Sequence, residues 1–212
     1  LDINTLEIDN TTYIDEKLKE FYSDMVYSVQ LKNQKTVKIS LLFEHKSAPP
    51  QFPHLQLLDY MQGIWRNDVR PRKIRAAAKK GSKIDKKQLT TVIPIIFYHG
   101  KAKWTKKPFK AFFGASDTVI AEFIPTINYH LINLADYDDE FIINLKAGFL
   151  INSLLAFKHN NDTLYIKQHF ARIFVNLEYD AHNESTRNFM QTLSIYIMIT
   201  TSLTSYEVNE LI

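Results

Sequence analysis

Two β-prone segments joined by a short polar turn are the strongest constraint on how this 212-residue chain can fold. Tyr22–Leu31 is rich in β-forming residues, and Lys35–Phe43 is a β-prone run in which Val, Ile, Leu and Phe recur at alternate positions. The intervening Lys32-Asn33-Gln34 has the composition of a hairpin turn. The sequence therefore predicts an antiparallel β-hairpin folded at about residue 34.

Two acidic positions and a lysine fall at mirrored ends of this hairpin. Because residue 34 is midway between Asp24 and Glu44, we expect these two residues to lie opposite or nearly opposite each other, with their Cβ atoms roughly 5 Å apart. Side chains alternate between faces along a strand, so Lys46 shares the face of Glu44 while His45 points away. Two carboxylates and an ammonium group are thus predicted to converge.

Such a convergence has a chemical use. Two carboxylates this close repel each other unless a cation lies between them, and oxygen ligands favour Mg²⁺. We expect Asp24 and Glu44 to bind the metal, with the backbone carbonyl of His45 as a further ligand. Lys46 would position the attacking water or stabilise developing charge during phosphodiester hydrolysis. The alternative is a solvated charge cluster at a strand end, because the bare spacing D-x19-E-x-K is common.

The composition excludes several classes of protein. The chain is 45% apolar and 13% aromatic, which is enough for a real core. The absence of cysteine excludes disulfides and thiolate metal sites and is typical of a reducing compartment, so we expect a cytoplasmic protein. No apolar run approaches the roughly 20 residues that span a bilayer, so we expect no membrane partner. The first residue is Leu1 rather than Met, and we expect the sequence to begin inside a longer protein.

The charge is distributed unevenly. The segment from Arg66 to Lys110 has fifteen Lys or Arg against two aspartates, a charge of +13, so the rest of the chain carries −10. This pattern indicates either a surface that faces a polyanion such as DNA or a solubilising loop. The expected DNA-binding residues are Arg66, Arg70, Arg72, Lys73, Arg75, Lys79, Lys80, Lys101 and Lys103.

The remaining periodicities outline the architecture. Leu6–Tyr13 is a candidate first strand, and helical spacing of apolar residues predicts an amphipathic helix from Leu55 to about Arg70. Thr91–Tyr98 reads as a buried strand in which Pro94 requires an edge or bulge position, because proline cannot donate to the ladder.

From about residue 139 onward the pattern is helical. Segments near 139–159, 162–179, 186–203 and 204–212 are separated by breaks rich in Asn, Asp and Ser, which suit helix caps. The sequence predicts an α/β core over residues 1–138, followed by an all-helical region over residues 139–212. Apolar faces in that region leave open a homo-oligomer formed through the C-terminal helices.

Four motifs occur in order and carry a resemblance. They are SD at 23–24, LLFEHKS at 41–47, LLxYMxxIW at 57–65 and VIPIIFYHG at 92–100. Over roughly residues 5–140 the chain resembles the bacterial recombination-promoting nuclease family, a transposase-like family within the PD-(D/E)XK nuclease superfamily. The run that ends in Tyr98-His99-Gly100 is the most specific part of the resemblance.

The resemblance implies a restriction-endonuclease-like core, in which a mixed sheet is flanked by helices. It also implies DNA cleavage that depends on Mg²⁺, with Mn²⁺ as a substitute, and a link to DNA recombination or mobile elements. Asp24 matches the metal-binding aspartate of that superfamily, and Glu44 with Lys46 matches its E-x-K element, where many members of the family carry Gln in place of the lysine. Family members begin with a helical segment that can carry a further acidic site residue, which we expect to precede Leu1.

Four further residues have roles that the sequence leaves open. Gln56 occupies a place where many relatives are expected to carry Arg. Tyr60 either packs in the core or flanks the active centre, and His99 either contacts a phosphate and shuttles a proton or caps the turn at Gly100. Trp104 among lysines either stacks on nucleic acid or packs in the core. The leading hypothesis is a DNA endonuclease, and the alternative is a nuclease-fold module that binds DNA or protein without cutting.

Overall fold

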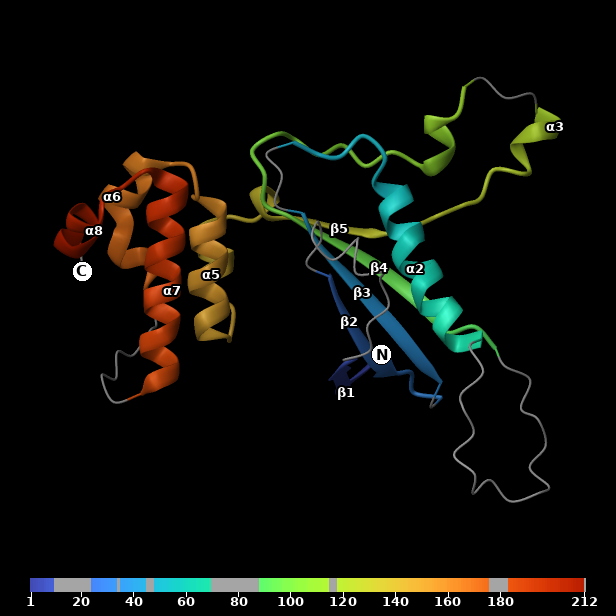
Figure 1. Cartoon of the computed structure of the whole chain (residues 1–212), viewed down its shortest axis with the longest axis horizontal. Helices are drawn as coiled ribbons and strands as arrows, with labels where there is room; N and C mark the ends of the chain where they lie inside the picture. The colour runs from blue at the N-terminus through green and yellow to red at the C-terminus, as the bar shows by residue number, and fades with distance from the viewer. Residues whose placement is uncertain are drawn as a thin grey trace, which may run out of the picture. The chain divides into compact units, whose positions relative to one another are not determined.

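The chain forms two compact units, Leu1–Ile132 and Asn133–Ile212, each of which is described by itself. The structure is a computed structural model that describes residues 1–9, 24–33, 35–44, 48–69, 88–114, 118–175 and 183–211. The first unit is an α/β arrangement built on a mixed sheet, and the second is helical (Figure 1).

The sheet has five strands in the order β1-β2-β3-β4-β5. They are β1 (Asp2–Ile8), β2 (Asp24–Gln30), β3 (Thr36–Glu44), β4 (Thr91–Tyr98) and β5 (His130–Asn133). β1 and β2 pair antiparallel, as do β2 and β3, whereas β3 and β4 pair parallel. Parallel neighbours need a crossover connection, and here it contains helix α2 (Pro53–Val69), which runs alongside β3 and β4 (Figure 1).

The predicted hairpin is confirmed, but its register differs from the expected one. Gln30 pairs with Thr36 and Asp24 pairs with Leu42, so the hairpin folds at residue 33 rather than 34. The Leu31 amide donates to the Lys35 carbonyl over 2.8 Å and closes the turn. Of the two expected arrangements, opposite or nearly opposite, the second holds for Asp24 and Glu44, because Glu44 lies two residues beyond Leu42, the partner of Asp24.

Helix α2 is held against the sheet along its length. Leu57 and Tyr60 pack with Ile96 and Tyr98 of β4, and Ile64 packs with Val26 and Val92. The sequence prediction of this helix was displaced by two residues at its start, because Pro53 is accepted at the first helical position.

Hydrogen bonds tie the last turns of α2 to the start of β4. The Trp65 indole Nε1–H donates to the Thr90 carbonyl over 2.9 Å, and the Thr90 amide donates to Asp68 Oδ2 over 2.9 Å. The start of β4 is therefore anchored to the end of the helix that precedes it along the chain.

Neither position predicted for Pro94, at an edge or at a bulge, is found, because β4 is not an edge strand and its pairing with β3 runs through Pro94 without a register shift. β4 lies between β3 and β5, and Pro94 pairs with Ser40 of β3. β5 has only four residues against eight in β4, so it cannot pair along the whole of β4.

A partly buried ion pair joins the end of β1 to the hairpin. Lys38 Nζ lies 2.8 Å from Asp9 Oδ2, and the Asp9 amide donates to the Val26 carbonyl over 2.7 Å. Short elements follow β4 in this unit, namely the 3₁₀ helix η1 (Phe109–Phe112) and helix α3 (Thr118–Ala121).

The second unit begins with the 3₁₀ helix η2 (Leu134–Asp136) and continues as α4 (Asp139–Ile143), α5 (Gly148–Lys158), α6 (Thr163–Ile173), α7 (Glu184–Thr201) and α8 (Ser205–Leu211). The helix expected near 139–159 is in fact two helices, α4 and α5, which are separated by residues 144–147. The predicted caps include Asp162 and Asn183, whose side chains accept from the amides of Tyr165 and Thr186. No helix in the described ranges is both long and apolar enough to cross a membrane.

The side chain of Asp139 links three helices of the second unit. Its carboxylate accepts a hydrogen bond from Lys158 Nζ over 2.7 Å and another from the Tyr165 hydroxyl, and His159 Nε2 lies 3.0 Å away. Burial by itself raises the pKa of Asp139, but the hydrogen bonds from Lys158, Tyr165 and His159 outweigh it and hold the pKa well below its ordinary value of 3.8. One carboxylate thus joins α4, α5 and α6.

Replacement of Leu57 by Ala tests the packing of α2. Leu57 is completely buried, so the variant should lose about 3 kcal/mol of unfolding free energy through lost burial and a residual cavity. Leu55 on the same helix is 49% exposed, and Leu55→Ala should change stability by less than about 0.5 kcal/mol. Denaturant unfolding followed by fluorescence measures this, because both tryptophans, Trp65 and Trp104, lie in the first unit. Equal losses in the two variants would contradict the packing.

Replacement of Asp139 by Asn should destabilise the second unit at neutral pH by about 3 kcal/mol, because Lys158 is left without a compensating charge. A carboxyl whose folded pKa is depressed stabilises the fold above its unfolded pKa, and this contribution is lost as the pH falls through the folded value. The difference between wild type and variant should therefore shrink below a pH of about 4. Denaturant unfolding followed by far-UV circular dichroism, repeated at several pH values, measures this difference in stability. The matched control is Glu140→Gln, an exposed carboxylate next in sequence, which should have little effect at any pH.

Candidate functional site

The two candidate carboxylate residues lie at the same end of the sheet, where β2 begins and β3 ends. Asp24 is the first residue of β2 and Glu44 is the last residue of β3. Because Asp24 pairs with Leu42 and the pleat repeats every two residues, Asp24 and Glu44 belong to the same face of the sheet. Diagonal neighbours of this kind have Cβ atoms about 7 Å apart. The side chains of Asp24 and Glu44 are not among the parts of the chain that the structure describes.

The parallel pairing of β3 with β4 places this edge beside the core. Glu44 pairs with Tyr98 and Leu42 pairs with Ile96, and both of these β4 residues are fully buried beneath α2. Asp24 and Glu44 therefore belong to the face of the sheet that α2 covers. His45 and Lys46, expected as a carbonyl ligand and as the catalytic lysine, lie outside the described residues.

The three auxiliary candidates are all placed by the structure. Gln56 is half-buried on α2, and its Oε1 atom is buried with no hydrogen-bond partner among the described residues. Tyr60, one turn further along the helix, belongs to the core cluster with Ile96 and Tyr98. His99 follows β4 directly and is buried, with its ring 6.2 Å from that of Phe97.

The basic residues divide into two groups. Arg66 is exposed on α2, and Lys101 and Lys103 are exposed in the loop that follows β4. Residues 70–87 lie outside the described residues, and with them Arg70, Arg72, Lys73, Arg75, Lys79 and Lys80.

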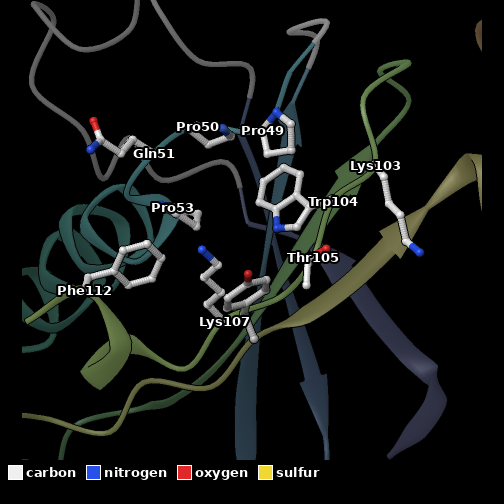
Figure 2. A pocket seen from close by; sticks show the side chains of 10 residues that line it. Pro49, Pro50, Gln51, Pro53, Lys103, Trp104, Thr105, Lys107 and Phe112 are labelled. Atoms are coloured by element: carbon white, nitrogen blue, oxygen red, sulfur yellow. The ribbon is translucent and has the colours of Figure 1, made fainter.

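The structure adds a pocket that sequence reasoning did not find. A cavity of about 540 Å³ opens in the first unit, at the sheet edge where β3 and β4 end (Figure 2). Its lining residues come from the loop after β3, the first turn of α2, the loop after β4, η1 and the approach to β5; they are Pro49, Pro50, Gln51, Pro53, Lys103, Trp104, Thr105, Lys107, Phe112 and Tyr129. The sequence did hold a signal, because aromatic residues alternate with lysines over residues 101–113.

Contacts with the core fix the walls of this pocket. Trp104 packs edge-to-face on Tyr98, with ring centroids 5.0 Å apart, and the Tyr98 hydroxyl donates to the Ala102 carbonyl over 2.9 Å. Lys106 Nζ donates to the Tyr129 carbonyl and lies 4.7 Å from the centre of the Tyr129 ring. The loop after β4 is thus attached both to β4 and to the segment before β5.

His54 contacts two of the aromatic residues that line the pocket. Its ring stacks on Phe109 with centroids 4.9 Å apart and meets Phe112 and Tyr129 edge-on. Neither ring nitrogen has a hydrogen-bond partner in the described part of the chain. Burial, and after it the charge of Lys106, holds the pKa of His54 below its ordinary value of 6.5, so the neutral ring is favoured.

No three His, Asp or Glu side chains gather as a metal site within the described ranges, which do not include the side chains of Asp24 and Glu44. The metal site expected at the hairpin therefore stays a prediction, and the strand register shows only that Asp24 and Glu44 lie on the same face of the sheet.

Comparison with known proteins assigns the chain to a family. Residues 1–185 match the family model described as "Putative transposase, YhgA-like". The chain belongs to this family. The match covers the whole first unit and reaches into the second.

Individual relatives are more distant. The chain is 29% identical over 101 residues to recombination-promoting nuclease RpnC and 28% identical over 99 residues to RpnA, both of Escherichia coli K12. It is 26% identical over 99 residues to RpnD of Escherichia coli O157:H7. These matches cover 47–48% of this chain but only 29–33% of the relatives, so the alignment spans about a third of their length or less. No solved structure matches the chain.

Replacement of His54 by Phe tests the aromatic surroundings of the His54 ring. The His54 ring lies among aromatic rings without polar partners, so Phe should keep or raise stability at pH 7. A histidine whose folded pKa is lowered binds its proton more weakly than in the unfolded chain, so wild-type stability should fall as the pH drops below about 6.5. The variant should lose that part of the pH dependence in thermal unfolding between pH 8 and pH 5.5. An unchanged pH slope would contradict the assignment.

Proposed function

We propose that this chain carries the catalytic core of a Mg²⁺-dependent DNA endonuclease of the PD-(D/E)XK type, linked to DNA recombination or mobile elements. One observation carries the proposal: two carboxylate positions, Asp24 and Glu44, end adjacent antiparallel strands on the same face of the sheet. Family membership and relatives named recombination-promoting nucleases support the reaction class.

The arrangement suits metal-assisted phosphodiester hydrolysis. Asp24 and Glu44 would bind Mg²⁺, or Mn²⁺ in its place, because diagonal neighbours on one face are within reach of a shared ion. The His45 carbonyl would complete the protein ligands, and Lys46 would orient the attacking water. When bound, the metal polarises the phosphate and lowers the pKa of its water.

Residues of α2 and β4 would assist from the side of the core. Gln56 offers a buried amide oxygen without a partner in the described residues, which suits it to hold a water or a neighbouring donor near the site. Tyr60 and His99 are proposed as auxiliary residues that fix the geometry of this end of the sheet, since Tyr60 is buried against β4 and His99 is buried directly after it.

The basic segment would engage the phosphate backbone. Arg66, near the end of α2, and Lys101 and Lys103, in the loop after β4, are exposed, as DNA contacts must be. Further phosphate contacts are proposed for Arg70, Arg72, Lys73, Arg75, Lys79 and Lys80. Such contacts release counterions, so affinity for DNA should fall steeply as the salt concentration rises.

Nicking of supercoiled plasmid by the purified chain tests the proposal. Cleavage should require Mg²⁺ or Mn²⁺ and stop in EDTA. Asp24→Asn should remove it, and Lys46→Ala should slow it by at least about a hundredfold, the cost of losing one group that stabilises transition-state charge. The matched control is Asp59→Asn, an exposed carboxylate on α2, which should cut at the wild-type rate.

Two outcomes would contradict the nuclease. Undiminished cutting by Asp24→Asn and Lys46→Ala would exclude this site as the catalytic centre. Retardation of DNA on a gel without nicking under any divalent ion would instead support a nuclease-fold module that binds without cutting.

A further inference from the structure

We propose that the pocket bounded by Trp104 and Tyr129 binds one unpaired nucleotide of the DNA substrate, with its base inside and its phosphate at the mouth. The DNA substrate itself rests on the proposed nuclease function, whereas the pocket and its chemistry rest on residues of the first unit that the structure describes.

The position of the pocket is the first argument. Pro49 and Pro50 lie three and four residues after Lys46, and Pro53 begins α2. Trp104 follows the end of β4, whose last residue, Tyr98, pairs with Glu44. A nucleotide held here would therefore be next to the strand edge where the scissile phosphate is expected.

The shape and lining are the second argument. A volume of about 540 Å³ is within the range of roughly 300–1,000 Å³ typical of small-ligand pockets. Trp104 and Tyr129 are buried and form apolar walls together with three prolines, and Phe112 is half-exposed at the side. The polar part of the lining consists of Gln51, Lys103, Thr105 and Lys107. Flat apolar walls of this kind suit a nucleobase, because every base has a π-face that packs on aromatic rings without regard to sequence.

Charge is the third argument. None of the lining residues that the structure describes is acidic, and residues 88–114 carry five lysines with no Asp or Glu. Lys107 extends toward the space between Trp104, Pro53 and Phe112, whereas Lys103 points away from it (Figure 2). Both are exposed, so Lys107 can meet a phosphate at the mouth and Lys103 can meet the next phosphate along the strand.

Recessed walls select for an unpaired base. A base in an intact duplex is stacked and paired on both sides, and it can enter such a pocket only after it leaves the helix. That cost is smallest at a bulge, a mismatch or a single strand. The pocket therefore predicts a substrate preference for DNA with an unpaired nucleotide.

Binding in Ca²⁺, with DNA integrity checked on a gel, tests the pocket without cleavage. Two labelled duplexes that differ by one unpaired adenosine serve as probes, and fluorescence anisotropy measures their affinities. Wild type should bind the bulged duplex about tenfold more tightly, the order expected for stacking of one base. Thr105→Trp should fill the pocket from an exposed position and abolish this preference, while Thr105→Val should retain it.

Control variants separate pocket filling from other effects. Lys32→Ala removes an exposed lysine at the β2–β3 turn, and it should leave the ratio of the two affinities unchanged. Circular dichroism should show that Thr105→Trp is folded like wild type. Equal affinities of wild type for the two duplexes would overturn the proposal, as would a preference that persists in Thr105→Trp.

Failure of the pocket and failure of the nuclease are distinguishable. If Mg²⁺-dependent nicking occurs but the bulge preference is absent, the pocket proposal is overturned and the nuclease stands. If the preference is present and sensitive to Thr105→Trp but no divalent ion supports cutting, the pocket stands and the nuclease is overturned.

Discussion

The parallel pairing of β3 with β4 is the constraint on which the rest of the first unit depends. Two parallel neighbours cannot be joined by a tight turn, so α2 must cross over between them, and its apolar side then covers the sheet. Leu57 and Tyr60 on the helix and Ile96 and Tyr98 on β4 form the resulting core. This packing sets Glu44 beside Tyr98, and it also brings the loops after β3 and β4 together as the walls of one pocket.

The candidate site and the pocket lie at the same end of the sheet, where β3 and β4 end. Strand ends leave backbone and side chains free of sheet packing, so functional residues gather there while buried residues such as Ile96 hold the scaffold rigid. Asp24 and Glu44 supply negative charge at the ends of β2 and β3, and the loop after β4 supplies lysines beside aromatic rings. Carboxylate residues and a cationic, aromatic-lined cavity at the same end of the sheet form a combination suited to nucleic acid, because lysines can bind phosphates and aromatic rings can stack on bases.

Local sequence patterns predicted the individual strands and helices better than they predicted how these elements pair and pack. The hairpin was recognisable from alternation in Lys35–Phe43, and α2 from helical spacing after Leu55, because each pattern reflects one buried face of one element. The hairpin folds within the predicted turn, but its midpoint is residue 33 and not residue 34, and the side chain of Asn33 accepts from the Lys35 amide. The interior position of β4 was missed because the shortness of β5 is a property of the sheet and not of Pro94.

The sequence by itself determined which chemical groups this protein has and on which strands they lie: Asp24 on β2, Glu44 on β3, and lysines interleaved with aromatic residues after β4. These features are local, and periodicity and composition encode them. Only the tertiary structure decided that Asp24 is diagonal to Glu44, and that Pro50, Trp104 and Tyr129 surround one cavity. Register and cavities arise when segments far apart in sequence pack together, and hydrophobic burial, which drives that packing, has no direction that a single segment can reveal.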